Sequence, residues 1–259
     1  MSTETRSIPG AQSVVRPTTR RRLDPARRTA LAGGIAYLVT FAASLPQLKL
    51  FAGLVDDPAR YISSPGGNAA VQWGSWLEVV TAASGVATAI LLYPITRRVS
   101  RTAAIGFVTS RVVEAALILV GVMSVLSVVT LQHHYAGAGG AQADALGVTG
   151  TALVTMRQWT FLLGPGLMAG FNDLFLGYVL YRSRLVPRLI PIVGLVGVPL
   201  ILVSASATLL GGWAQVSTAG ALCALPIAAF ELAVGVWLTV KGFRPAALAA
   251  LDVPSAPTV

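Results

Sequence analysis

Two residues of opposite charge lie inside the longest apolar stretch of the chain. The stretch covers residues 103–131 and contains Arg111 and Glu114. On a helix, side chains three positions apart share one face, so these two can form an ion pair. Ionisable groups inside a membrane span are costly unless they face protein or water, and there they hold or pass protons or polar solutes. The pair therefore predicts a helix whose charged face is turned toward other helices.

Further polar groups interrupt two other apolar stretches. Asn172 and Asp173 are neighbours in one of them, and Glu231 lies in the last one. With about 1.5 Å of rise per residue and about 30 Å of hydrocarbon, these groups, Arg111 and Glu114 fall at similar depths of roughly 12 to 17 Å from one membrane edge. We therefore expect one buried polar layer that consists of Arg111, Glu114, Asn172, Asp173 and Glu231.

One arginine and three acids cannot all be charged in low-dielectric surroundings without a cost of several kcal/mol. We expect Arg111 to bridge one or two of the acids, and a remaining acid to carry a proton, so that the cluster titrates as a group. Arg111 would be the fixed cation and Asp173 or Glu231 the proton-accepting group, with Asn172 supporting hydrogen bonds.

Three functions are compatible with such a layer. It can bind or translocate a small solute or a proton, and we take this as the leading hypothesis. It can be structural, in a non-catalytic scaffold that associates with other membrane proteins. It can also belong to a membrane enzyme that acts on a lipid through carboxylates alone. The sequence leaves enzymatic activity open but favours its absence.

A second pair of opposite charges is expected near the other membrane edge. Glu78 lies roughly 10 Å from that edge, where Arg157 can approach it. Other reactive groups are sparse. The adjacent His133 and His134 lack further ligands at metal-binding spacing, and Cys223 is the single cysteine, which excludes an intrachain disulfide. We expect no metal site and no cofactor.

The composition predicts that these groups lie in a membrane protein. Of the 259 residues, 54% are hydrophobic and only 11% are charged, whereas soluble domains carry roughly 25% charged residues. Apolar stretches long enough to cross a bilayer repeat along the chain. We predict an all-α integral membrane bundle of six transmembrane helices, at about residues 30–47, 71–95, 103–131, 157–181, 187–211 and 218–240.

The segments between these helices carry their own expectations. Residues 48–70 are predicted to be a polar connection. Residues 132–156 are predicted to be a longer loop, part of which, residues 141–155, could form a short surface helix. The fourth helix contains Gly164-Pro165-Gly166, which predicts a kink or a break because proline has no amide hydrogen and clashes with the preceding turn.

The basic residues predict the orientation. Residues 1–28 contain seven arginines and no apolar periodicity, so we expect a disordered cytoplasmic tail that is attracted to anionic lipid headgroups. With both termini cytoplasmic, 15 of the 19 Lys and Arg residues lie on the cytoplasmic side, as the positive-inside rule requires. The domains are then this tail, a membrane domain at 29–241 and a short C-terminal tail at 242–259. The net charge of +9 is explained by orientation, and no nucleic acid is expected as a partner.

Five segments in order resemble a known family. They are residues 28–39 (RTALAGGIAYLV), 91–101 (LLYPITRRVSR), 111–115 (RVVEA), 173–187 (DLFLGYVLYRSRLVP) and 231–244 (ELAVGVWLTVKGFR). The chain resembles the bacterial membrane proteins grouped as domain of unknown function 4386. The resemblance implies a six-helix membrane fold in the bacterial inner membrane and no assigned activity. Arg111, Glu114, Asp173 and Glu231 are among the residues that carry it.

Overall fold

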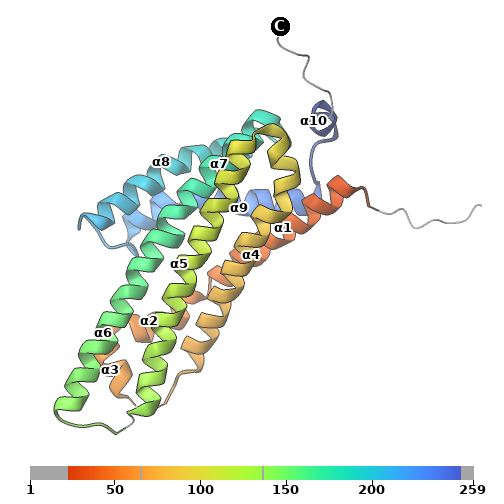
Figure 1. Cartoon of the computed structure of the whole chain (residues 1–259). Helices are drawn as coiled ribbons and strands as arrows, with labels where there is room; N and C mark the ends of the chain where they lie inside the picture. The colour runs from red at the N-terminus through yellow and green to blue at the C-terminus, as the bar shows by residue number, and fades with distance from the viewer. Residues whose placement is uncertain (1–22, 65, 136, 252–259) are drawn as a thin grey trace, which may run out of the picture.

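The computed structural model describes residues 23–64, 66–135 and 137–251, which are almost entirely helical and contain no strand (Figure 1). The helical elements are α1 (Pro25–Ser44), α2 (Gln47–Asp56), α3 (Pro58–Ser63), α4 (Ala69–Val99), α5 (Arg101–His134), α6 (Ala141–Phe161), the π-helix η1 (Leu162–Met168), α7 (Ala169–Ser183), α8 (Leu189–Leu209), α9 (Thr218–Val240) and α10 (Pro245–Ala250). The long helices pack side by side, with α5 between α4 and the run α6–η1–α7.

Five helical stretches in the described residues are long and apolar enough to cross a membrane. They are α1 with α2, then α4, α5, α8 and α9. Large apolar side chains such as Met123 and Val203 are exposed on them, as lipid contact requires. The chain is therefore a multi-pass membrane protein. The fourth predicted helix, at 157–181, falls in the run α6–η1–α7, which is not among these five.

The buried apolar residues form clusters toward each end of the bundle. One cluster joins α1, α4, α5, α7 and α9 and includes Tyr37, Phe107 and Phe230. Another joins α2, α3, α5 and α6 and includes Phe51 and Val125. Along α5 the buried charged groups lie between these two clusters, so the interior changes from apolar to polar and back to apolar.

The prediction that residues 48–70 are a polar connection is wrong over most of its length. The segment forms α2 and α3, and Phe51, Leu54 and Ile62 are buried in the second core cluster. The spacing of Phe51 and Leu54 places them on one helix face, which a short amphipathic helix buries. Asp57 begins α3, since its Oδ1 accepts a hydrogen bond of 3.0 Å from the backbone amide of Arg60.

The predicted loop at 132–156 is also largely helical. Helix α5 continues to His134, and α6 begins at Ala141. The expected surface helix is the first part of α6. It packs inward through Leu146, Gly150 and Val154, because these apolar positions repeat at helical spacing.

The expected kink at Gly164-Pro165-Gly166 takes the form of the π-helix η1. Pro165 cannot donate a hydrogen bond to the carbonyl of Phe161, one turn earlier. Instead, Gln215 Nε2 donates a hydrogen bond of 3.2 Å to that carbonyl. A π-helical turn accommodates the missing bond without ending the helix, so α6 and α7 form one helical run.

Each of the two predicted tails lies partly outside the described residues. Helix α1 begins at Pro25, so the last residues of the predicted 1–28 tail are helical, while residues 1–22 lie outside the described residues. The predicted C-terminal tail contains the short helix α10, and residues 252–259 again lie outside the described part.

Candidate functional site

A close crossing of α1 and α9 brings two side chains to the centre of the bundle. A Cβ atom added to Gly34 on α1 would lie 2.6 Å from the backbone nitrogen of Thr239 on α9. The two backbones can therefore approach this closely only at a glycine. Tyr37 and Glu231 lie one or two turns from the crossing on their helices, so it delivers both to the same interior region.

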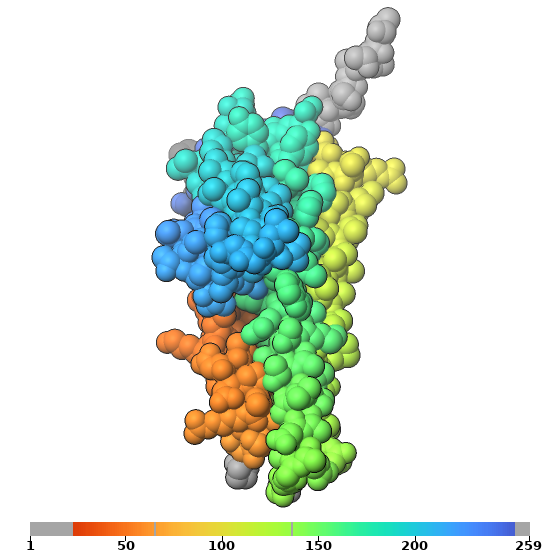
Figure 2. All heavy atoms as spheres, turned by 90° about the vertical axis from the view of Figure 1, so that its left-hand side faces the viewer, coloured from red at the N-terminus to blue at the C-terminus, as the bar shows by residue number. Residues whose placement is uncertain are grey.

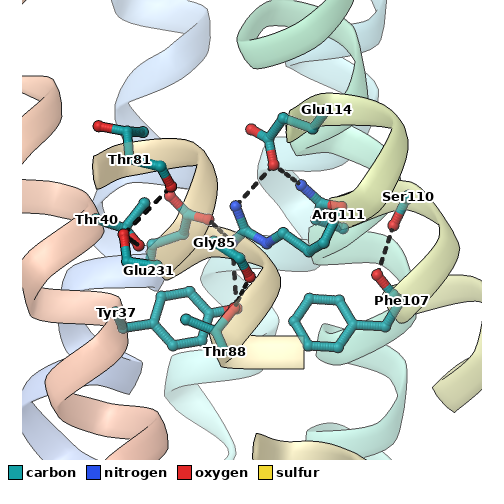
Figure 3. Close-up of polar contacts among 12 residues, drawn as sticks. Tyr37, Thr40, Thr81, Gly85, Thr88, Phe107, Ser110, Arg111, Glu114 and Glu231 are labelled. Carbon is teal, nitrogen blue, oxygen red and sulfur yellow. Dashed lines mark hydrogen bonds and ion pairs between the residues drawn. The ribbon is translucent and has the colours of Figure 1, made fainter. Parts of the chain in front are cut away.

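Arg111 is the centre of this region (Figure 3). Its Nη1 donates a hydrogen bond of 2.9 Å to Glu114 Oε2. Its Nη2 donates to Glu231 Oε1 and, at 3.4 Å, to Tyr37 Oη. The guanidinium carbon also lies 5.4 Å and 5.8 Å from the ring centroids of Tyr37 and Phe107, within cation–π range. One cation thus joins α5 to α1 and α9.

Helix α7 completes the cluster with an amide and a carboxyl group. Asn172 Nδ2 donates a hydrogen bond of 2.8 Å to Glu114 Oε2. Asp173 is 0% exposed, and neither of its carboxyl oxygens has a hydrogen-bond partner among the described residues. It lies within electrostatic range of Arg111, Glu114 and Glu231. Burying a charged carboxyl group without a hydrogen-bond partner is costly.

The structure therefore places all five residues of the predicted layer close together, but with different partners. Glu114 and Glu231 bind Arg111, while Asp173 stands apart from the ion pairs. Arg111 is 2% exposed, whereas the side chain of Glu231 is 18% exposed. Glu231 is thus the more exposed of the two acids that bind Arg111, since the side chain of Glu114 is 11% exposed.

A small cavity of about 10 Å³ lies beside the cluster. Arg111, Glu114, Thr40, Thr81 and Ile118 are among its lining residues. A cavity needs roughly 10–15 Å³ of such space to hold one water molecule. The cavity therefore matches water in size and is too small for an organic solute.

Thr40 and Thr81 extend polar contacts from this cavity to α1 and α4. Thr40 Oγ1 donates a hydrogen bond of 2.7 Å to Ser84 Oγ, and Gln47 Nε2 donates one of 2.9 Å to Thr81 Oγ1. The wall of the cavity on this side is therefore a set of hydroxyl groups.

The second predicted pair also meets. Arg157 Nη2 donates a hydrogen bond of 2.5 Å to Glu78 Oε1, and both side chains are buried. The guanidinium carbon of Arg157 lies 4.5 Å from the ring centroid of Phe51 and 5.2 Å from that of Phe161. On α4, Glu78 is seven residues from Gly85, which contacts Arg111, so the two ion pairs are about 10 Å apart along the helix axis.

Sequence reasoning missed several members of the site. Tyr37 could have been suspected, because it is a polar aromatic residue inside an apolar stretch. Phe51 was assigned to a connection, so its contact with Arg157 could not be anticipated. The two histidines took no part in the expected site, and His133 Nε2 lies 3.0 Å from Asn68 Nδ2. Among the described residues there is no group of three or more His, Cys, Asp or Glu side chains placed to hold a metal ion.

Comparison with known proteins identifies a family without an assigned activity. The family described as "Domain of unknown function (DUF4386)" matches residues 32–242. Since this match covers most of the chain, the protein belongs to that family. No curated protein and no solved structure matches the chain.

Proposed function

We propose that this member of the DUF4386 family takes up and passes a proton at the layer formed by Arg111, Glu114, Asn172, Asp173 and Glu231. The single observation that carries the proposal is the buried Asp173 carboxyl group, which has no hydrogen-bond partner among the described residues and lies beside a cluster of two acids and one arginine. A neutral carboxyl group placed next to charged acids is a proton donor and acceptor. A proton is favoured over a small solute because the adjacent cavity matches one water molecule in size.

The residues take distinct roles in this proposal. Arg111 is the fixed cation, which holds the charges of Glu114 and Glu231 in place. Asp173 carries the proton, and Asn172 fixes Glu114 by its hydrogen bond. Glu231 receives the proton from Asp173, since it lies within electrostatic range of that group and is the more exposed of the two acids that bind Arg111. Tyr37 faces the same region, and its hydroxyl group orients the guanidinium.

We also propose that the chain crosses the plasma membrane of a bacterium six times, with both termini cytoplasmic. The run α6–η1–α7 would be the additional crossing, because its helical length exceeds the roughly 20 residues that a bilayer needs. In Figure 1 the turn between α4 and α5 and the turn between α7 and α8 lie toward the same end of the bundle, opposite the turn between α5 and α6. The two turns at that end carry Arg97, Arg98, Arg182 and Arg184, which favours the cytoplasm on that side.

The bilayer is the partner that the helices imply, and anionic headgroups are the proposed partner of the basic N-terminal segment. Arg27 contacts the protein and is not counted among the lipid-binding arginines. It donates hydrogen bonds of 2.7 Å and 2.6 Å to the carbonyls of Leu238 and Thr239 at the C-terminal end of α9. A cation at a helix C-terminus interacts favourably with the helix dipole. Lipid binding is therefore assigned to the arginines before Arg27.

A structural role is the second candidate. It is favoured by one observation, the small size of the cavity beside Arg111, since a cluster that only joins helices needs no space for a ligand. A lipid-acting enzyme is disfavoured, because Asp173, the acid outside the ion pairs, is 0% exposed and a lipid headgroup has no contact with it.

Infrared spectroscopy and proton flux test the proposal. The protonated Asp173 carboxyl group is expected to give a carbonyl band that disappears in Asp173→Asn. Proteoliposomes with this variant or with Glu231→Gln are expected to lose the proton flux that the wild-type protein supports under a pH gradient. Asp144→Asn is the control, because Asp144 is an exposed acid of α6. If all three variants fold and retain both the band and the flux of the wild-type protein, the proposal is wrong.

A further inference from the structure

We propose that protons reach the central cluster from the end of the bundle that contains α2 and α3, by a route that Arg157 closes at its mouth and Ile118 interrupts in the middle. The inference rests on the proposed function and extends it, since it names the path and its two barriers. Three cavities follow one another along this route through the bundle.

The route begins at a surface groove with a volume of about 570 Å³. Phe51 of α2, Arg157 and Phe161 of α6, and Gln215 from the segment after α8 are among its lining residues. Figure 2 shows this face of the molecule, with α8 and α9 over its upper part and α2 and α6 below them. Water and ions from solution can enter a groove of this size, but most of its walls are apolar.

Arg157 separates the groove from the interior. It lines the groove and also a second cavity of about 10 Å³ that contains Glu78. Its guanidinium lies over the rings of Phe51 and Phe161 and is bonded to Glu78. A cation that contacts two aromatic rings and is paired with an acid is held firmly. The Glu78–Arg157 pair is therefore a plug, with an acid on its inner side.

Ile118 separates this second cavity from the one beside Arg111. It is the residue that lines both water-sized cavities, and it is buried. It lies on α5 one turn after Glu114. Each cavity matches about one water molecule in size, and an isoleucine offers no group that can carry a proton. The path therefore has polar groups on both sides of Ile118, and Ile118 itself is apolar.

The chemistry of the route is a proton relay. When Arg157 moves aside, a hydronium ion from the groove transfers a proton to Glu78 and leaves as water, which neutralises Glu78 and weakens its bond to Arg157. Glu78 then releases the proton into the cavity behind it, and the O–H bond that breaks there is replaced by one on the next acceptor. When the side chain of Ile118 moves aside, water connects the two cavities and carries the proton to Glu114, which lines the inner cavity. Asp173 passes the proton that it already holds to Glu231 and takes up the incoming proton from Glu114, since both acids lie within electrostatic range of it. One proton enters and one is delivered, so no other reactant is required.

Replacement of Ile118 tests the route. Ile118→Ser replaces the apolar side chain with a shorter one that has a hydroxyl group. Proton flux into proteoliposomes, measured with an internal pH-sensitive dye, is expected to rise about tenfold or more. The matched control is Ile105→Ser, because Ile105 lies on the same helix but is exposed. The double variant Glu78→Gln with Arg157→Gln removes the plug without leaving a lone buried charge, and it is expected to change the flux as well.

The outcomes separate this inference from the proposed function. If Ile118→Ser raises the flux no more than Ile105→Ser does, the route is wrong, while the infrared band of Asp173 still tests the proton site. If Ile118→Ser raises the flux but Asp173→Asn leaves the infrared spectrum unchanged, the route stands and the role of Asp173 is wrong. If the flux of the Glu78 and Arg157 double variant equals that of the wild-type protein, Arg157 is not the barrier at the mouth.

Discussion

The charge balance at Arg111 leads to a prediction about stability that does not depend on the function. Arg111→Met removes the cation that holds Glu114 and Glu231. Leaving one side of a buried ion pair without its partner costs about 3–5 kcal/mol. The cost is expected within this range, because the side chains of Glu114 and Glu231 are only 11% and 18% exposed.

Two further variants show whether the loss of stability comes from an unpaired buried charge or from poorer packing. Glu114→Gln leaves the bond between Arg111 and Glu231 intact, so it is expected to cost only about 1–3 kcal/mol, the value of one charged hydrogen bond. The triple variant Arg111→Met, Glu114→Gln and Glu231→Gln contains no unpaired charge at these positions. It is expected to recover most of the stability, since replacing a buried ion pair as a whole is often close to neutral.

Unfolding in detergent, followed by circular dichroism against temperature or denaturant, measures these differences. Arg60→Met is the control, because Arg60 is exposed on α3 and its side chain forms no ion pair with another described residue. An exposed arginine of this kind is expected to contribute less than about 1 kcal/mol. The reasoning is refuted if Arg111→Met is no less stable than Glu114→Gln, or if the triple variant is as unstable as Arg111→Met alone.

Three further predictions concern packing and hydrogen bonds, and the same unfolding measurement checks them. Gly34→Ala forces α1 away from α9 and is expected to lower stability by about 1–3 kcal/mol, whereas Gly53→Ala, with no atom within 4 Å of the added Cβ, should leave it unchanged or higher. Gln215→Ala removes the side-chain hydrogen bond to the carbonyl of Phe161 and should cost about 0.5–1.5 kcal/mol; an unchanged stability would mean that the π-helix needs no such support. Tyr37→Phe removes one long hydrogen bond of 3.4 Å and should cost at most about 1 kcal/mol, so a larger loss would assign the hydroxyl group a greater role than this geometry gives it.

Much of the fold could be predicted from the sequence because membrane helices obey local rules. Apolar length sets which segments can cross a bilayer, and the ends of α4, α5, α8 and α9 differ from the predicted bounds by only a few residues. The rule fails for short helices outside the apolar stretches. Residues 48–70 were taken for a connection because α2 and α3 are too short to span the bilayer, and their apolar faces become visible only against the second core cluster.

For the candidate site, too, part could be predicted from the sequence and part could not. The cost of burying a charge in lipid made it possible to select Arg111, Glu114, Asp173 and Glu231 and to expect them at one depth. The partners of Arg111 could not be selected, because depth does not determine how a helix is rotated about its axis. That rotation depends on contacts between distant residues, such as the crossing at Gly34 that turns the side of α9 with Glu231 toward Arg111.

The sequence by itself determined that this protein is built from apolar helices with buried charges, because hydropathy and charge are properties of each segment alone. Only the tertiary structure decided that Glu231 binds Arg111 while Asp173 is left without a partner. It also decided that Phe51 lies against Arg157 and that Ile118 lies between two water-sized cavities. Pairing and enclosed space depend on how side chains from several helices fill a common volume, and no single segment contains that information.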